Sequence, residues 1–341
     1  MVKKFTVTDY LLLLFALAFI VLIILTPSIS AQGAKYGLHV SAIVLMPSLF
    51  PFAVPVLFLI NTRLLGNTKH RLLYLFFLSL IGGYPIGAKL VAELYGKESI
   101  ELQTAKRYLP FYVNGGPAFI IIAVGKGILH NAALGYVLLL SHCAASLILV
   151  LIFAPGILRK NESGNLPNAK ISTLDNFVSS INNSSGTCIL ISAFVVFFSV
   201  VNRYVEYFSD SIPFLKGLLY ITEVTYAVSH TKNVYFISFL LGFAGISIWV
   251  QVFSVTRKTK PKLITFMAVR ILHGIISAAI SAVIIRLFRI NITVISNNVL
   301  INEKTVYSGL NLSISLFIML LLFLINLTSK KHSGNFIKDM L

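Results

Sequence analysis

A short apolar run that ends in glycines and a proline constrains the fold of this chain more than any other feature. Residues 72–81 are almost entirely apolar, but a helix needs roughly 20 apolar residues to cross a bilayer. The run continues into Gly82-Gly83-Tyr84-Pro85-Ile86-Gly87-Ala88-Lys89-Leu90-Val91-Ala92-Glu93. Glycine and proline release backbone N–H and C=O groups, which a membrane interior tolerates only where that backbone is buried in protein or lines a wet cavity. Short, interrupted apolar segments point to a transporter binding site. They predict here a re-entrant helical hairpin near 72–95.

Composition places the chain in a membrane. Of its 341 residues 57% are apolar and 11% are charged, and the mean hydropathy is +0.88. These values predict an all-α polytopic membrane protein, with the lipid bilayer as a partner. The formal net charge of +17 comes from basic residues that flank apolar segments, as orientation signals do. Because they do not form a soluble basic face, nucleic acid is not expected as a partner.

The order of apolar and polar stretches divides the chain into segments. Residues 1–36 are expected to form an N-terminal transmembrane helix, with a cleavable signal peptide as the alternative. A first repeat covers 37–154 and includes the hairpin near 72–95. A polar linker covers 155–175. In the first repeat, Pro47, Pro51 and Pro55 predict a kinked helix.

The second part of the chain has the same order of elements. Residues 176–288 form a second repeat, with a second hairpin expected near 234–256. Residues 289–341 contain a loop, a last transmembrane helix over 310–327 and a basic tail. The hairpin turns are assigned to glycines, namely Gly82, Gly83, Gly87, Gly242 and Gly245.

The two repeats align without a gap. When Gly83-Tyr84 is placed on Gly242-Phe243, Asn114-Gly115 falls on His273-Gly274. The number of crossings between the hairpins predicts that they enter from opposite sides of the membrane, as inverted repeats require. One feature disagrees, because the basic loop Arg257-Lys258-Thr259-Lys260-Pro261-Lys262 would then face outward. The alternative is an extra crossing by 215–230.

Motifs in both halves carry a family resemblance. The first half contains Gly82-Gly83-Tyr84-Pro85-Ile86-Gly87-Ala88-Lys89-Leu90 and Asn114-Gly115-Gly116-Pro117-Ala118-Phe119-Ile120. The second half contains Glu223-Val224-Thr225, then Gly242-Phe243-Ala244-Gly245-Ile246-Ser247 with Gln251, then Arg270-Ile271-Leu272-His273. Over roughly 37–286 this ordered set resembles the YlbJ-type sporulation integral membrane proteins of the nucleoside-recognition, or Gate, family. Glycine usually stands in those proteins where this chain has Ala244.

The resemblance implies a transporter with the architecture of concentrative nucleoside transporters, in which two opposed hairpins meet near mid-membrane. It further implies a sporulation role, the movement of dipicolinic acid across the outer forespore membrane. Composition and spacing do not reveal that substrate. An ion-coupled nucleoside symporter and a non-transporting scaffold of a sporulation complex are the alternatives.

Several polar residues inside apolar segments are candidates for substrate contact, because ionisable groups within a membrane are functional candidates by default. Lys89 and Glu93 share a helix face and could pair with each other. Glu223 could carry a proton, bind a cation or hold a substrate donor. Arg270 offers a planar fork suited to a carboxylate, and His273 can exchange a proton.

The complete set of predicted substrate-binding residues combines these with neutral groups beside the expected turns. It consists of Tyr84, Pro85, Lys89, Asn114, Glu223, Thr225, Ser247, Gln251, Arg270 and His273. Hairpin tips direct helix N-termini at one point, and with Lys89 and Arg270 this favours a small anion. His130 and His142 are expected to be interfacial or core residues.

Enzymatic activity is not expected. The sequence contains no HExxH, GxSxG or Walker A motif and no paired aspartates within the apolar spans. No cofactor or metal site is predicted, and a proton or a sodium ion is the candidate for coupling. Cys143 and Cys188 lack the spacing of a metal or redox pair and are expected to be small buried hydrophobes. Whether the chain forms a homo-oligomer stays open.

Overall fold

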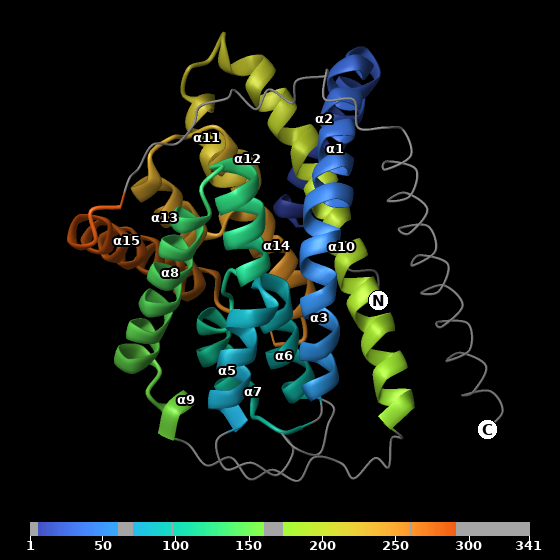
Figure 1. Ribbon diagram of the computed structural model, residues 1–341. Helices are drawn as coiled ribbons and strands as arrows, with labels where there is room; N and C mark the ends of the chain where they lie inside the picture. The colour runs from blue at the N-terminus through green and yellow to red at the C-terminus, as the bar shows by residue number, and fades with distance from the viewer. Residues whose placement is uncertain (1–5, 61–70, 97, 160–172, 260, 291–341) are drawn as a thin grey trace, which may run out of the picture.

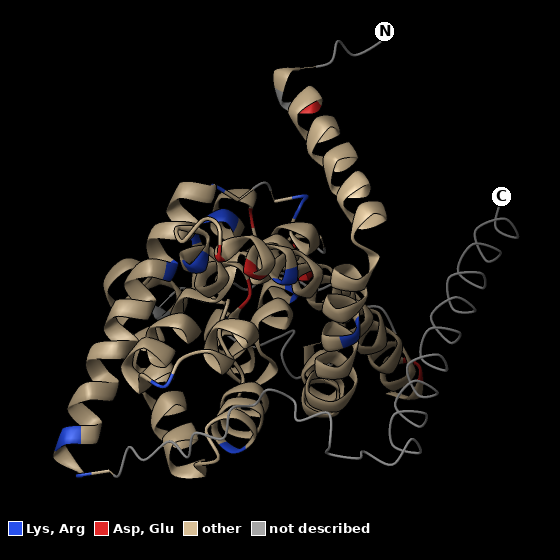
Figure 2. Cartoon of the chain, turned by 90° about the horizontal axis from the view of Figure 1, so that it is seen from above, with Lys and Arg blue, Asp and Glu red and all other residues tan. Residues whose placement is uncertain are grey.

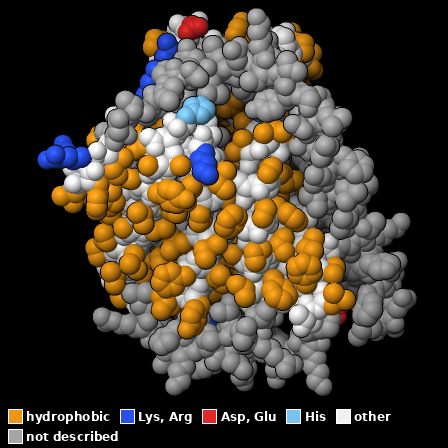
Figure 3. All heavy atoms as spheres, viewed as in Figure 1, with side chains coloured by type: hydrophobic (Ala, Val, Ile, Leu, Met, Phe, Trp, Pro, Cys, Tyr) orange, Lys and Arg blue, Asp and Glu red, His pale blue; other side chains and the backbone are white. Residues whose placement is uncertain are grey.

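The computed structural model describes residues 6–60, 71–96, 98–159, 173–259 and 261–290, and within them every regular element is a helix (Figure 1). Five helical segments are long and apolar enough to cross a membrane: Pro27–Ile60, Ala132–Phe153, Thr173–Ser209, Val234–Val255 and Leu263–Leu287. Their outward side chains are mostly hydrophobic (Figure 3), for example Leu140 and Ile152, each 61% exposed. The prediction of an all-α polytopic membrane protein is confirmed. The predicted helix over 310–327, the basic tail, Lys3, Lys4 and Lys260 lie outside the described residues.

The N-terminal helices are a lipid-facing helix and a kinked span. Helix α1 (Val7–Leu25) begins with a capping box in which Asp9 and Thr6 bond to each other's backbone N–H, and it projects away from the bundle (Figure 2). The kinked span consists of α2 (Pro27–His39), the π-helical turn η1 (Val40–Leu45) and α3 (Met46–Ile60). The wide turn ends just before Pro47, where the proline ring excludes a normal helix hydrogen bond, so the predicted irregularity is present.

The first predicted hairpin is formed by α5 (Arg71–Gly82) and α6 (Tyr84–Gly96). Gly83 separates them with φ +89°, a conformation that glycine adopts at little cost. A Cβ on Gly87 would lie 2.8 Å from Cβ of Ser79, whereas residues that far apart in an unbroken helix lie about 12 Å apart along its axis. Helix α6 therefore folds back along α5.

An interrupted helix follows the hairpin. It consists of α7 (Leu102–Tyr108), the 3-10 turn η2 (Leu109–Phe111), non-helical residues 112–116 and the π-helix η3 (Ala118–Ile128). The predicted unwinding beside Gly115-Gly116-Pro117 is thus present. Helix α8 (Ala132–Phe153) then crosses the bundle and ends near the short α9 (Gly156–Arg159).

The second half begins with α10 (Thr173–Ser209), which packs antiparallel to the first kinked span. Gly33 contacts Val200 and Gly37 contacts Val196 near one end. At the other end, Nδ2 of Asn176 donates to the carbonyl of Phe58 at 3.2 Å. The two spans therefore run in opposite directions.

Helices α11 (Leu215–Thr222) and α12 (Val224–Ser229) form a second fold-back. They are separated by Glu223, whose backbone is extended at φ −142° and ψ 123°. The hydroxyl of Tyr220 donates to the carbonyl of His230 at 3.4 Å, which ties the outer end of α12 back to the side of α11. The alternative of an extra crossing by 215–230 is therefore wrong, because these residues form a short helical hairpin.

Helices α13 (Val234–Phe243) and α14 (Gly245–Val255) contain the break predicted for the second hairpin. Ala244 and Gly245 both have positive φ, at 73° and 71°. Helix α14 does not return along α13, however. It runs beside α6, since Gln251 shares a cavity with Tyr84 and Val255 shares a pocket with Glu93. The prediction of a hairpin near 234–256 is wrong in this respect, because 234–255 is a broken span that continues through the bundle.

Because 234–255 passes through the bundle, the basic loop after it no longer conflicts with the predicted orientation. Arg257 and Lys258 lie beside Glu93 and Gly96, at the end of the bundle where the first hairpin has its outer ends. Helix α15 (Leu263–Leu287) then returns antiparallel to α13. Gly242 and Gly274 lie backbone to backbone, and the hydroxyls of Ser238 and Ser277 are hydrogen bonded at 2.9 Å.

Candidate functional site at the helix breaks

Four interruptions of helical backbone meet in the interior of the bundle. Within the first half, a Cβ on Gly116 would lie 3.1 Å from the N atom of Gly83. In the second half, a Cβ on Gly245 would lie 3.2 Å from the N atom of Val224. Tyr84 joins the halves, because its hydroxyl donates to the carbonyl of Leu241 at 2.7 Å. Each fold-back thus lies against the broken span that follows it.

Arg270 is buried at this meeting point, 1% exposed, and bonds to both broken spans. Its Nη1 atom donates to the carbonyl of Val113 at 2.6 Å, and its Nη2 atom donates to the carbonyl of Gly242. Carbonyls at helix ends lack their usual N–H partners, and a guanidinium supplies several donors in a fixed geometry. Arg270 therefore stabilises the broken backbone and places a positive charge next to it.

Two histidines pack beside Arg270. The rings of His142 and His273 have centroids 4.3 Å apart, and Nε2 of His273 bonds to the carbonyl of His142 at 3.0 Å. The N–H of Gly115 donates to Nε2 of His142 at 2.9 Å. His142 was expected to be an interfacial or core residue, and it proves to anchor the unwound stretch. The sequence does contain an indication of this role, because Ser141 and Ser146 are further polar residues on the same buried part of an apolar helix.

Asn114 was predicted to contact substrate, but its side chain is engaged within the protein. Its Nδ2 atom donates to the hydroxyl of Ser79 at 3.2 Å and to the carbonyl of Phe111 at 2.9 Å. Its Oδ1 atom accepts from the hydroxyl of Ser146 at 2.9 Å. Asn114 therefore ties the unwound stretch to α5 and α8.

A small cavity of about 40 Å³ lies on the other side of Tyr84. The polar residues around it are Glu223, Thr225 and Gln251, all buried. The rest of its lining is mostly apolar and backbone, including Gly83, Tyr84, Pro85, Leu45, Leu49, Gly116, Phe119, Ile191, Val195, Val224 and Ile248. Such a volume holds a few water molecules but no larger solute. The described conformation is therefore closed around this cavity.

Glu223 lies at the edge of the cavity and caps a helix there. One carboxylate oxygen accepts from the N–H of Tyr226 at 2.6 Å and caps α12. Capping satisfies an N–H group that has no partner within the helix. Ser247 is close by and receives a hydrogen bond from the side chain of Gln251 at 3.3 Å. The structure thus brings together five predicted residues at one cavity: Tyr84, Pro85, Glu223, Thr225 and Gln251.

Two predicted turn glycines serve in packing. A Cβ on Gly87 would lie 1.8 Å from the carbonyl oxygen of Tyr112, and a Cβ on Gly242 would lie 2.5 Å from Cα of Gly274. Gly82 is buried beside Ile86. Of the turn set, Gly83 and Gly245 have positive φ.

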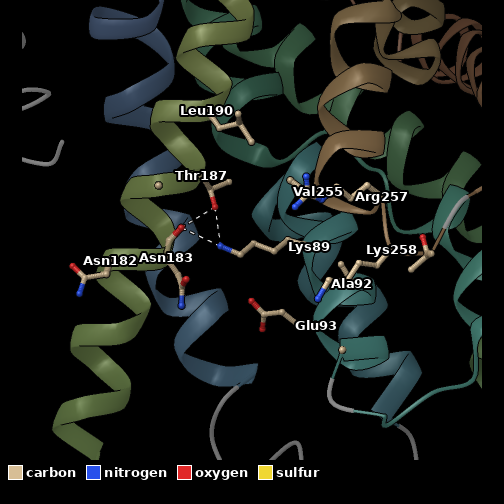
Figure 4. A pocket seen from close by; sticks show the side chains of 13 residues that line it. Lys89, Ala92, Glu93, Asn182, Asn183, Thr187, Leu190, Val255, Arg257 and Lys258 are labelled. Atoms are coloured by element: carbon tan, nitrogen blue, oxygen red, sulfur yellow. Dashed lines mark hydrogen bonds between the residues drawn. The ribbon is translucent and has the colours of Figure 1, made fainter. Parts of the chain in front are cut away.

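Lys89 lies away from the cavity. The predicted pairing of Lys89 with Glu93 is not observed, and Lys89 bonds to α10 instead. Its Nζ atom donates to the carbonyl of Asn183 at 3.1 Å and to the hydroxyl of Thr187 at 3.0 Å. These acceptors on α10 draw the ammonium across an open pocket of about 420 Å³, and Glu93 lies on the rim of the same pocket (Figure 4).

Broken helices that meet around buried charge, in a chain with several apolar spans, define a multi-pass integral membrane protein with a polar interior site. Sequence comparison finds the sporulation integral membrane protein YlbJ of Bacillus subtilis (strain 168), 26% identical over 312 aligned residues. The match covers 74% of this chain and 76% of that protein. The chain is thus similar to a YlbJ-type integral membrane protein over most of its length, and the resemblance that its motifs indicated is confirmed. No protein-family model matches the chain, and no solved structure matches it.

Proposed function

We propose that this protein is a membrane transporter of a small organic anion that acts in sporulation. The main support is that four helical segments are interrupted and that their interruptions meet at one place. The interruptions lie at Gly83, residues 112–116, Glu223 and residues 244–245. Irregular backbone at membrane depth is costly unless it lines a site or is buried in protein. A scaffold protein needs no such arrangement, so the convergence favours transport.

The order of elements supports an inverted repeat in a different register from the one predicted. The first unit consists of the kinked span α2–α3, the fold-back α5–α6, the broken span α7–η3 and the span α8. The second consists of α10, the fold-back α11–α12, the broken span α13–α14 and α15. Glu223, rather than Gly242, then corresponds to Gly83. The antiparallel packing of α2–α3 against α10 supports opposite orientations of the two units.

The charges near the breaks favour an anion over a neutral nucleoside. Arg270 is fully charged at neutral pH, and its hydrogen bonds go to carbonyls, which do not neutralise it. The sporulation relative and the family resemblance together suggest dipicolinate as the anion and the outer forespore membrane as the place of action. Protonation of Glu223 is the candidate for coupling to a proton.

Uptake by the purified protein in liposomes tests this function. Dipicolinate that enters liposomes loaded with terbium ions forms a luminescent complex, and uridine serves as the competing nucleoside. We expect dipicolinate uptake that excess uridine does not inhibit, and loss of uptake when both Lys89→Gln and Arg270→Gln are introduced. Uptake of uridine alone would favour the symporter alternative. The absence of uptake of either solute by well-folded protein would favour the scaffold alternative.

A further inference from the structure

An open pocket lies between α6, α10 and the loop after α14, and its lining is strongly basic. We call it the basic pocket. Lys89, Arg257 and Lys258 supply three positive charges, and Glu93 is the one carboxylate among the lining residues. Within the described ranges, no carboxylate forms an ion pair with Arg257 or Lys258. The pocket therefore has an uncompensated positive charge.

Neutral hydrogen-bonding groups complete the lining. Asn182, Asn183 and Thr187 come from α10, and Thr259 comes from the loop after α14. Figure 4 shows the α10 side chains opposite Arg257 and Lys258, with Lys89 extended between them. The volume of about 420 Å³ falls within the range of small-molecule sites, roughly 300–1,000 Å³. This space can hold a planar anion of one aromatic ring, whereas the central cavity cannot.

The basic pocket lies in line with the central cavity along the same three helices. On α6, Pro85 lines the cavity and Lys89 lines the pocket. On α14, Gln251 lines the cavity and Val255 lines the pocket, and on α10 Ile191 and Thr187 do the same. Because residues four apart lie on one helix face, each helix presents a continuous strip from one space to the other.

A thin apolar layer separates the two spaces. Ala88, Cys188 and Val252 lie between the two sets of lining residues in sequence, and each is at most 3% exposed. All three side chains are small or medium in size, so a modest displacement of α6 or α14 would open a path.

We propose that the basic pocket is the first binding site for a small dianionic carboxylate, from which the anion passes the layer at Cys188 to the central cavity. The passage rests on the proposed transport function, but binding in the pocket does not. Two separated carboxylates fit a site whose cations lie on opposite walls, with Lys89 reaching α10 and with Arg257 and Lys258 on the loop. Charge-assisted hydrogen bonds of this kind are short and strong.

Equilibrium binding of dipicolinate to the full chain in neutral phosphatidylcholine nanodiscs tests the pocket. We expect Arg257→Gln with Lys258→Gln to weaken binding by about tenfold or more, because two charge-assisted contacts are lost. The matched control is Arg286→Gln with Lys126→Gln, which removes the same charges from α15 and η3, outside the pocket. Equal affinity in both double variants would overturn the proposal. The proposal would also be overturned if the double variant lost binding of phosphatidylglycerol added to the nanodiscs but kept its affinity for dipicolinate.

The path is tested by reaction of Cys188 in a Cys143→Ser background. We expect an anionic thiol reagent to label Cys188 more slowly when dipicolinate is present or when Arg257 and Lys258 are neutralised. A neutral reagent should be unaffected by the neutralisation. If neither change alters the rate at which the anionic reagent labels Cys188, the proposed path is rejected. Uptake with unchanged binding in the double variant rejects the pocket but leaves transport standing. Charge-dependent binding without uptake keeps the pocket and rejects transport.

Discussion

The hydroxyl of Tyr84 donates a 2.7 Å hydrogen bond to the carbonyl of Leu241, and this contact joins the turn of the first fold-back to the end of α13. Both groups are buried, and the carbonyl lies in the last turn of a helix, where its regular partner is missing. One phenolic hydroxyl at the meeting point thus helps to hold the two halves of the chain together, beside the bonds of Arg270 and His273.

Tyr84→Phe should reduce stability without changing the packing of the ring. Loss of the donor leaves the Leu241 carbonyl buried and unsatisfied, at a cost of about 1–3 kcal/mol. We expect a lower thermal unfolding midpoint of the detergent-purified protein. Tyr220→Phe is the control, because its bond to His230 is 3.4 Å long and lies at the exposed end of a fold-back. Equal midpoints for the two variants would contradict this role of Tyr84.

Gly87→Ala should prevent normal folding. The new Cβ would lie 1.8 Å from the carbonyl oxygen of Tyr112, which belongs to backbone and cannot move aside independently. Overpacking of this kind costs about 1–3 kcal/mol, occasionally more. Size-exclusion chromatography and yield of monodisperse protein provide the measurement. Gly217→Ala is the control, since nothing lies within 4 Å of its Cβ position, and alanine favours the helix there by about 1 kcal/mol.

Ala244→Gly should be tolerated, unlike other substitutions of buried alanine. Its φ of 73° costs a non-glycine residue roughly 1–2 kcal/mol, which offsets the loss of one buried methyl group, about 0.8 kcal/mol. Ala145→Gly is equally buried but lies in regular helix α8, so it should lose about 2 kcal/mol from helix propensity and burial together. Unfolding midpoints compare the two. A larger loss for Ala244→Gly would show that the left-handed turn is not strained.

Glu223→Gln and Glu223→Ala should separate the capping of α12 from the proposed proton coupling. Glutamine keeps an acceptor for the N–H of Tyr226 and should retain the unfolding midpoint, while alanine should lose about 1 kcal/mol of capping. If the carboxylate also carries a coupled proton, both variants should abolish the dependence of uptake on a proton gradient. Proton-dependent uptake by Glu223→Gln would limit Glu223 to a structural role.

The positions where glycine and proline break helices could be predicted from the sequence. The turn at Gly83, the unwinding beside Pro117 and the break at 244–245 all follow from residues with low helix propensity. The predicted register of the repeat placed Gly83 on Gly242, and it therefore paired the turn of a fold-back with a residue of a broken span.

The fourth break could not be predicted in the same way, because no glycine or proline marks it. Glu223 ends α11 with an extended backbone and supplies the cap of α12 with its own side chain. A glutamate in an apolar stretch indicates function as readily as a helix boundary. The partners of Lys89 were missed for a related reason, since a sequence shows the neighbour four residues away but not the carbonyls of a distant helix.

The glycine contacts between α2 and α10 bear on how this molecule could work. Gly33 and Gly37 lie so close to Val200 and Val196 that a methyl group would come within 2.7 Å of their Cα atoms. Helices packed this closely cannot slide or rotate against each other without steric clashes, so α2 and α10 form a rigid pair. We therefore expect the movements that the proposed transport requires to occur in α6 and α14, against this rigid pair of helices.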